Sequence, residues 1–224
     1  MTFSIAAVCP DTGAVGCAIT SSSICVTSRC AFAKTAVGVA LTQNITNPDL
    51  GSLALEALSN GASVEQAMQT LHQAEPHIEW RQIGLLDKQG NSAIHSGAQS
   101  LGIYASAKGE NCLAMGNLLA NDSVPQAMVD AFKASTDSDF AQRLLSALQA
   151  GLTAGGEMGD IHSAGLLVHE SASWPSVDLR VDLQVHPIAQ LQILLDDYQP
   201  QKQAYLTRAK DPANAESYGV PGDM

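Results

Sequence analysis

The second residue, Thr2, has a position that could give it a catalytic role. Initiator methionine is usually removed when the next residue is small, and its loss would leave Thr2 with a free α-amino group beside its own hydroxyl. A threonine hydroxyl is a weak nucleophile without a neighbouring base, and an N-terminal amine can be that base. With an ordinary pKa of about 7.7–8.0, such an amine can move protons near neutral pH. Many proteins that are not enzymes also begin with Met-Thr, so the role of Thr2 depends on its surroundings.

Hydroxyl and carboxyl groups elsewhere in the chain could shift the pKa of that amine. Ser4 lies two residues beyond Thr2 on a predicted strand, so the two side chains share one face. Ser21, Asp160 and Ser163 are candidates for setting the pKa of the amine, Ser163 because it begins a late predicted strand. The alternative is structural, because serine hydroxyls at turns and strand ends commonly bond to the backbone.

Amide groups could stabilise the oxyanion that forms when a carbonyl is attacked. The backbone N–H groups around Gln43 and Asn44, or the Asn44 side chain, stand where a predicted strand ends. Gln43 could equally hold a loop in place. Asn117, which follows Gly116, could contact a ligand or form an ordinary turn. We take Gln43 and Asn117 as candidates for binding substrate.

Two arginines stand on predicted strands of a chain that has few cations. Arg81 and Arg180 could each pair with a carboxylate, such as Asp178 or Asp182. They could instead clamp a substrate carboxylate through two parallel hydrogen bonds. Arg81 is therefore a further candidate for binding substrate.

The composition describes an acidic globular protein. Of its 224 residues, 46% are hydrophobic, 22 are Asp or Glu and 11 are Lys or Arg, which gives a net charge of −11. The chain therefore lacks the basic surface by which proteins bind nucleic acids or anionic membranes. It also lacks a long apolar run and the basic start of a signal peptide. We expect a cytoplasmic protein with a small-molecule or peptide substrate and no nucleic-acid or membrane partner.

Metal and cofactor motifs are missing from the sequence. The five cysteines form no CxxC pair, and their odd number argues against a disulfide framework or a zinc knuckle. None of the six histidines stands in an HExxH motif, and no glycine-rich nucleotide loop occurs. A triad of Asp160, His162 and Ser163 is disfavoured because neighbouring residues of a strand point to opposite faces. We expect no metal and no organic cofactor.

Strands, turns and helices follow one another in a mixed order. An opening hairpin is expected around Pro10–Gly13, because Pro presets φ and Gly permits a positive φ. The other elements follow from apolar spacing and from signals such as the capping box that begins at Ser63. Predicted strands cover residues 3–8, 14–20, 35–42, 81–87, 92–96, 112–118, 163–169 and 177–183, and predicted helices 49–60, 63–74, 123–133, 140–152 and 188–197. This order predicts an α+β fold in a domain of residues 1–198, with 199–224 as a polar, loosely packed tail.

Short pieces of the sequence carry, in order, a resemblance to a known family. They are Thr2-Phe3-Ser4-Ile5, Pro10-Asp11-Thr12-Gly13, Thr42-Gln43, Thr46-Asn47-Pro48, Arg81-Gln82-Ile83-Gly84, Gly116-Asn117, Ser163-Ala164 and Val177-Asp178-Leu179-Arg180-Val181-Asp182. Together they resemble a bacterial and archaeal family of N-terminal-nucleophile (Ntn) hydrolase-like proteins of unknown function. More distantly, the chain resembles the proteasome β-subunits. The resemblance implies a four-layer αββα sandwich of antiparallel sheets, with Thr2 at the end of a central strand and amide hydrolysis through an acyl-enzyme.

Two places depart from the pattern of that family. Thr20 stands where proteasome-like members carry an acid after the second strand. Between Gly155 and Ser163 the usual basic residue is missing, and His162 stands where Gln is usual. If this segment lines the site, Asp160 and His162 contact the ligand, and the preference for ligand charge differs in this chain.

The sequence supports three hypotheses about function. The first is an Ntn hydrolase that cleaves an amide or related C–N bond in a small molecule or short peptide. Its catalytic group would be Thr2 with Ser4, Ser21, Asn44 and Ser163, and we expect removal of Met1 to suffice for maturation. The second is a catalytically inactive Ntn-like module for binding or assembly, and the third is a conventional hydrolase that uses Ser4 or Cys112. A homo-oligomer is expected under either of the first two.

Overall fold

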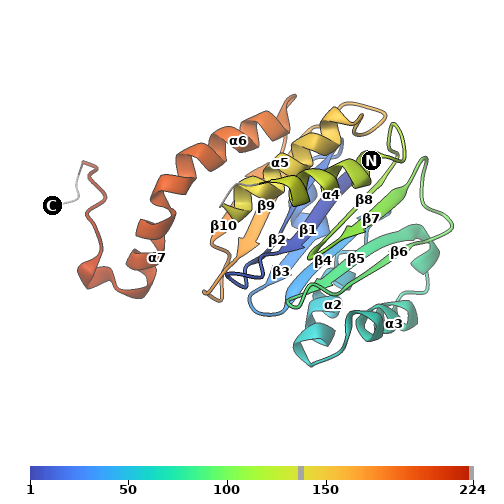
Figure 1. Cartoon of the computed structure of the whole chain (residues 1–224), viewed down its shortest axis with the longest axis horizontal. Helices are drawn as coiled ribbons and strands as arrows, with labels where there is room; N and C mark the ends of the chain where they lie inside the picture. The colour runs from blue at the N-terminus through green and yellow to red at the C-terminus, as the bar shows by residue number, and fades with distance from the viewer. Residues whose placement is uncertain (136–138, 222–224) are drawn as a thin grey trace.

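The structure, a computed structural model, describes residues 1–135 and 139–221 and contains two antiparallel β-sheets (Figure 1). The larger sheet has the spatial order β10-β9-β2-β1-β8-β7, and the smaller has the order β3-β4-β5-β6. The strands of the larger sheet are β1 Thr2–Val8, β2 Val15–Ser21, β7 Ala105–Gly109, β8 Cys112–Asn117, β9 Ser163–His169 and β10 Val177–Val181. Those of the smaller sheet are β3 Ala31–Lys34, β4 Gly38–Asn44, β5 Arg81–Asp87 and β6 Ser92–Ser96.

The chain begins with the hairpin that the sequence predicts. β1 and β2 pair in register from Thr2 opposite Ser21 to Val8 opposite Val15, and Gly13 turns the chain with a φ of +73°. Every residue of β1 is buried, so this strand has a covered face on each side. β1 also pairs with β8 on its other edge, which makes it a central strand of the larger sheet.

Helices cover the outer face of each sheet (Figure 1). On the larger sheet lie α4 Val124–Ala134, α5 Phe140–Thr153 and α6 Pro187–Tyr198, and on the smaller sheet lie α2 Asp49–Ser59 and α3 Val64–Ala74. The other helical segments of the described residues are shorter: α1 Val26–Cys30, α7 Lys202–Lys210, and the 3₁₀ turns Ile78–Trp80, Gln199–Gln201 and Pro212–Asn214. The capping box at Ser63 is present, with its hydroxyl accepting from the Gln66 N–H.

Buried apolar side chains form three clusters that follow one another through the molecule. The first joins the larger sheet to α4, α5 and α6, and includes Phe3 and Ile5 of β1. The second lies between the two sheets and includes Ala6 and Val8 of the same strand. The third joins the smaller sheet to α2 and α3. Odd-numbered residues of β1 therefore face helices, and even-numbered residues face the smaller sheet.

The predicted α+β class is confirmed, but several elements differ from the prediction. The expected strand 35–42 begins later, at Gly38, because Ala36 adopts a φ of +58° and reverses the chain between β3 and β4. The short elements α1, β3 and β7 were not predicted. The tail is also not loose throughout, since Lys202–Lys210 is helical, although none of that helix is buried. No helix in the described part of the chain is long and apolar enough to cross a membrane.

Candidate functional site

Four polar residues stand side by side across the larger sheet, and we call them the Thr2 row. Thr2 lies opposite Ser21 of β2 and Asn117 of β8, and Ser21 lies opposite Ser163 of β9. Residues directly opposite one another in an antiparallel sheet project from the same face. Because Phe3 faces the helices, this row faces the smaller sheet. All four residues are buried, Thr2 being 6% exposed.

Two hydroxyls of the Thr2 row, those of Thr2 and Ser21, converge on one carbonyl oxygen. Thr2 Oγ1 donates to the Met1 oxygen at 2.6 Å, and Ser21 Oγ donates to the same oxygen at 2.5 Å. The two hydroxyl oxygens are 3.3 Å apart. The arrangement therefore holds a carbonyl group directly against the hydroxyl of Thr2, with a second hydroxyl polarising it.

Ser163 acts on the backbone of the next loop. Its Oγ donates to the Ser23 oxygen at 2.5 Å and accepts from the Val26 N–H at 3.2 Å. The Ser23 N–H in turn donates to Ser21 Oγ at 3.0 Å. Ser163 thus has the structural role that the sequence left open, in which a serine hydroxyl bonds to the backbone. It fixes the loop that orients Ser21.

A network of side-chain amides joins the Thr2 row to the smaller sheet. Ser4 Oγ donates to Gln43 Oε1 at 2.9 Å, and Gln43 Nε2 donates to Gln82 Oε1 at 2.8 Å. Asn117 Nδ2 donates to the same Gln82 oxygen at 3.1 Å, while Gln82 Nε2 donates to the Gly116 oxygen at 3.0 Å. The network fixes which way the Asn117 amide points. The Asn117 Oδ1 is buried and has no hydrogen-bond partner within the described residues.

Sequence reasoning missed Gln82, although a signal was present. It is the one polar residue in the buried interior of β5, between the charged end residues Arg81 and Asp87, and it is fully buried. A buried amide needs partners, and the partners of Gln82 include the two predicted candidates Gln43 and Asn117.

Glu157 is the second residue near the Thr2 row that the sequence did not predict as a site residue. It is 6% exposed, its Oε2 accepts from the Ser22 N–H at 3.2 Å, and its Oε1 has no partner among the residues described. Burial raises the pKa of the Glu157 carboxyl to about 7, and the nearby Met1 ammonium acts in the opposite direction. The Met1 side chain packs on Gly159, where an added Cβ would lie 3.2 Å from Met1 Cε.

Two predicted candidates are engaged away from the Thr2 row. The Asn44 amide donates to the Trp80 oxygen at 2.7 Å and accepts from the Leu101 N–H at 3.1 Å, so it fixes a loop. The Arg81 guanidinium pairs with Glu75 at 3.2 Å in the layer of α2 and α3. The interpretation of a strand arginine as an ion-pair partner therefore holds for Arg81, although Glu75 was not the predicted carboxylate.

Asp178 is the carboxylate partner of the other arginine, as the sequence suggested. Arg180 holds it through two hydrogen bonds of 2.7 and 2.9 Å at the surface. Neither arginine is thus available as a free clamp.

The segment from Glu157 to Ser163 lies beside the Thr2 row. Asp160 is exposed, and the His162 ring lies 3.2 Å from the Ser22 oxygen, with its backbone N–H donating to the Ser21 oxygen. His162 is therefore a neighbour of Ser21, and its ring does not contact the Ser163 hydroxyl in the described contacts, which leaves the triad without support.

The thiol of Cys112 is poorly placed for catalysis. It lies opposite Ala7, at the other end of β1 from Thr2, and is fully buried. Burial raises the pKa of the thiol to about 11, which suppresses the reactive thiolate. No group of three His, Cys, Asp or Glu side chains in the described residues is arranged to hold a metal ion.

A pocket of about 470 Å³ opens beside Glu157. It lies between α5, the segment 155–161 and the start of α6, and its lining includes Glu157, Gly159, Asp160, His186 and Ile188. Exposed apolar side chains also stand on loops at the Thr2 end of the two sheets: Ile24, Ile45, Trp80, Leu101, Ile103, Tyr104 and Met158. The surroundings of Thr2 therefore combine a buried carboxylate with an apolar rim.

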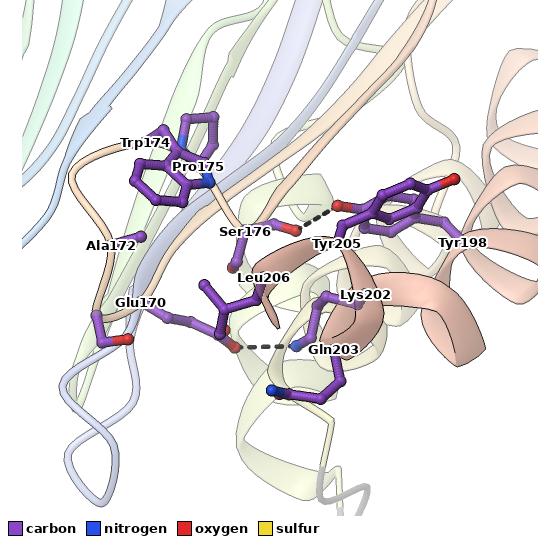
Figure 2. A pocket seen from close by; sticks show the side chains of 11 residues that line it. Glu170, Ala172, Trp174, Pro175, Ser176, Tyr198, Lys202, Gln203, Tyr205 and Leu206 are labelled. Carbon is purple, nitrogen blue, oxygen red and sulfur yellow. Dashed lines mark hydrogen bonds and ion pairs between the residues drawn. The ribbon is translucent and has the colours of Figure 1, made fainter. Parts of the chain in front are cut away.

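A second, smaller hollow of about 50 Å³ lies at the other end of β9 (Figure 2). It is bounded by the β9–β10 connection and the C-terminal helical segment. Two pairs of its polar groups are in contact: Lys202 Nζ lies 3.0 Å from Glu170 Oε1, and the Tyr198 hydroxyl donates to the Ser176 oxygen at 2.9 Å (Figure 2). This hollow is separate from the Thr2 row.

Comparison with known proteins gives a family and a solved relative. A family model described as "Family of unknown function (DUF1028)" matches residues 2–191. The crystal structure of protein SPO2555 from Silicibacter pomeroyi, a DUF1028 protein, is similar at a TM-score of 0.83 and 32% identity, over 88% of this chain and 86% of that one. Curated proteins give no match. The family match spans most of the chain, the whole Thr2 row included, and the chain belongs to the DUF1028 family.

Proposed function

We propose that the chain is an N-terminal-nucleophile hydrolase that cleaves an amide or related C–N bond through an acyl-enzyme on Thr2. The observation that carries the proposal is the carbonyl oxygen of Met1, held by both the Thr2 and the Ser21 hydroxyls. A substrate carbonyl whose oxygen takes the place of the Met1 oxygen would lie against the nucleophile, with its carbon displaced from the Thr2 nitrogen toward Thr2 Oγ1. The two facing sheets, each covered by helices, support the αββα arrangement of Ntn hydrolases as the framework.

The proposed reaction begins once the Met1–Thr2 bond has been cut. Thr2 Oγ1 attacks the substrate carbonyl carbon, and its proton passes to the freed α-amine of the same residue. The Ser21 hydroxyl donates to the developing oxyanion, as it does to the Met1 oxygen. The amine then returns the proton to the leaving nitrogen, which leaves as an amine, and water hydrolyses the ester on Thr2 to release the acid.

Asn117 is proposed to orient the amine. Its Nδ2 is fixed on Gln82, and its Oδ1 has no partner among the described residues, so Oδ1 can accept a hydrogen bond from an N–H of Thr2, which stands opposite Asn117. That bond would aim the nitrogen lone pair at the Thr2 hydroxyl. Asn44 is not assigned the oxyanion role, because its amide already makes two backbone contacts.

A pair of variants tests this proposal. Thr2→Ala should remove both amide turnover and labelling by an acylating electrophile, whereas Ser21→Ala should keep labelling and lower kcat by ~10²–10³-fold, the cost of one oxyanion donor. Both should unfold like the wild type in a thermal scan. Turnover that persists in Thr2→Ala would remove Thr2 from the mechanism.

A second function deserves a test because Met1 occupies the place proposed for substrate. If Met1 stays attached, Thr2 has no free amine, and the buried site serves binding or assembly. Ligand-induced thermal stabilisation of a chain that keeps Met1, with no covalent label at Thr2, would favour this second function.

A further inference from the structure

We propose that Glu157 recognises a positively charged amino group of the substrate, so that the preferred substrates are amides or short peptides whose acyl part carries a free α-amine. This inference deepens the proposed function and rests on it for the cleavage step. The binding step can be tested by itself.

Met1 supplies the geometry for this inference, since it is itself an aminoacyl group seated at Thr2. Its carbonyl oxygen lies between the Thr2 and Ser21 hydroxyls, and its side chain packs on Gly159. The charge of its ammonium lowers the pKa of the Glu157 carboxyl, against the larger effect of burial, although the two groups form no ion pair within the described residues. The carbonyl oxygen and the side chain of an aminoacyl group thus have places beside the nucleophile, and Glu157 is the carboxyl group on which the charge of its ammonium acts.

The state of the Glu157 carboxylate points to a missing cation. One oxygen accepts from the Ser22 N–H at 3.2 Å, while Oε1 is buried without a hydrogen-bond partner in the described residues. A buried carboxylate with an unmet oxygen is costly unless a donor or a positive charge reaches it. In the mature chain the Met1 ammonium is gone, and a substrate ammonium would reach the Glu157 oxygen that has no partner among the described residues.

The adjoining pocket suits such a group. Glu157 and Gly159 both line the hollow of about 470 Å³, together with the exposed Asp160. No Lys or Arg is among its lining residues, and His186 is the one basic side chain there. An acyl group with a free amine would therefore enter a site of negative potential, whereas a free carboxylate would be repelled.

Gly159 is proposed to set the size of the acyl side chain. It has no Cβ, and one added there would stand 3.2 Å from Met1 Cε and 3.8 Å from Met1 Sδ. Its φ lies outside the positive range, so an L-residue can replace it without backbone strain. A larger residue at this position should shift the preference from methionine to alanine derivatives.

The experiment measures binding to mature Thr2→Ala protein, whose lack of Met1 is checked by intact mass. The two probes are L-methioninamide and 4-(methylthio)butanamide, which differ only in the α-amine. Calorimetry should give an affinity for methioninamide at least about tenfold tighter, in the range of a charged hydrogen bond. Glu157→Gln should bring the two affinities within about twofold, while the matched variant Asp160→Asn of the exposed neighbour should keep most of the difference.

Each outcome decides the inference. Equal affinity of the two probes for the parent protein overturns it, as does a preference that survives in Glu157→Gln. A thermal scan establishes that Glu157→Gln is folded. If that variant unfolds, Gly159→Val replaces it, and a preference for methioninamide over alaninamide that Gly159→Val does not reduce overturns the inference.

The same probes separate this inference from the proposed function. With mature wild-type protein, cleavage of both amides at equal kcat/KM would leave the hydrolase intact and overturn recognition by Glu157. A Glu157-dependent preference in binding, without any acylation of Thr2, would keep the recognition site and overturn the hydrolase.

Discussion

At the scale of single residues, the buried carboxyl of Glu157 makes stability depend on pH. Its pKa rises from an ordinary 4.5 to about 7 because burial disfavours the charged form. The folded state therefore holds its proton more tightly than the unfolded state. This contribution to stability is fully present below about pH 4.5 and is lost as pH rises through 7.

Glu157→Gln should flatten that decline. The free energy of unfolding of the wild type, minus that of the variant, should fall between pH 4.5 and pH 7.5. Urea denaturation at several pH values measures this difference, and taking the difference removes the contributions of His72 and His169, whose lowered pKa values act in the opposite direction. A difference that is constant with pH would contradict the buried, protonatable carboxyl.

Gln82 should be costly to replace, because two buried amides donate to its one oxygen. Gln82→Met keeps the approximate volume but leaves Gln43 Nε2 and Asn117 Nδ2 without that acceptor. We expect a loss of about 2 kcal/mol or more in the free energy of unfolding. Gln69→Met on the exposed face of α3 is the matched control and should change stability by less than about 0.5 kcal/mol. Similar values for both variants would contradict the network.

Residue types predicted part of the site, and geometry decided the rest. Thr2, Ser21, Asn117 and Ser163 were all candidates, but only strand register shows that they share one row. Asn44 and Arg81 were candidates of the right chemical type that the fold engages elsewhere. Glu157 lies in the segment that departs from the family pattern, but it was not a site candidate because its burial comes from tertiary packing. Its sequence neighbours are a methionine and glycines, which give no periodic signal.

At the scale of elements, helix α1 depends on a glycine of β9. A Cβ at Gly165 would lie 1.9 Å from Thr27 Oγ1, and Thr27 is buried in α1. Since α1 follows the loop that Ser163 fixes, its displacement should also disturb Ser21.

Gly165→Ala should therefore lower both stability and any activity at Thr2. We expect a loss of about 1–3 kcal/mol in the free energy of unfolding, the usual range for an overpacked core. Thr27→Ala removes the closest atom, so the double variant should be more stable than the sum of the single changes predicts. Strict additivity in a double-mutant cycle would contradict direct contact between β9 and α1.

Elements with strong local signals were predicted, and elements made by tertiary pairing were not. The opening hairpin has a Pro-to-Gly turn, and α3 has its capping box. By contrast, β7 is a short edge strand without apolar alternation, and it forms by pairing with β8. α1 follows its N-cap Cys25, and the φ of +57° at Cys25 could not be predicted from a cysteine at that position.

At the scale of the whole molecule, the C-terminal helical segment adds little to the core. α7 has no buried residue, and its contacts include the Lys202–Glu170 pair and the stacking of Tyr205 on Tyr198. The family match also ends at residue 191, before this segment. Surface ion pairs and exposed ring contacts each contribute about 1 kcal/mol or less.

Removal of residues 199–224 should therefore leave the fold and the Thr2 row intact. We expect the free energy of unfolding to change by less than about 2 kcal/mol. A longer truncation that also removes α6 is the control, and it should fail to fold because Ile188, Leu191 and Leu195 are buried. Unfolding of the shorter truncation would show that the domain extends past residue 198.

The central claim is that Thr2 becomes an N-terminal nucleophile, and one mass-spectrometric experiment tests it most directly. Untagged protein is treated with an acylating electrophile, and both its intact mass and its modified peptide are determined. The account predicts a chain that lacks one methionine and carries a single adduct on Thr2, absent from Thr2→Ala. A chain that lacks Met1 but takes no adduct on Thr2, or one that takes its adduct on another residue, would contradict it.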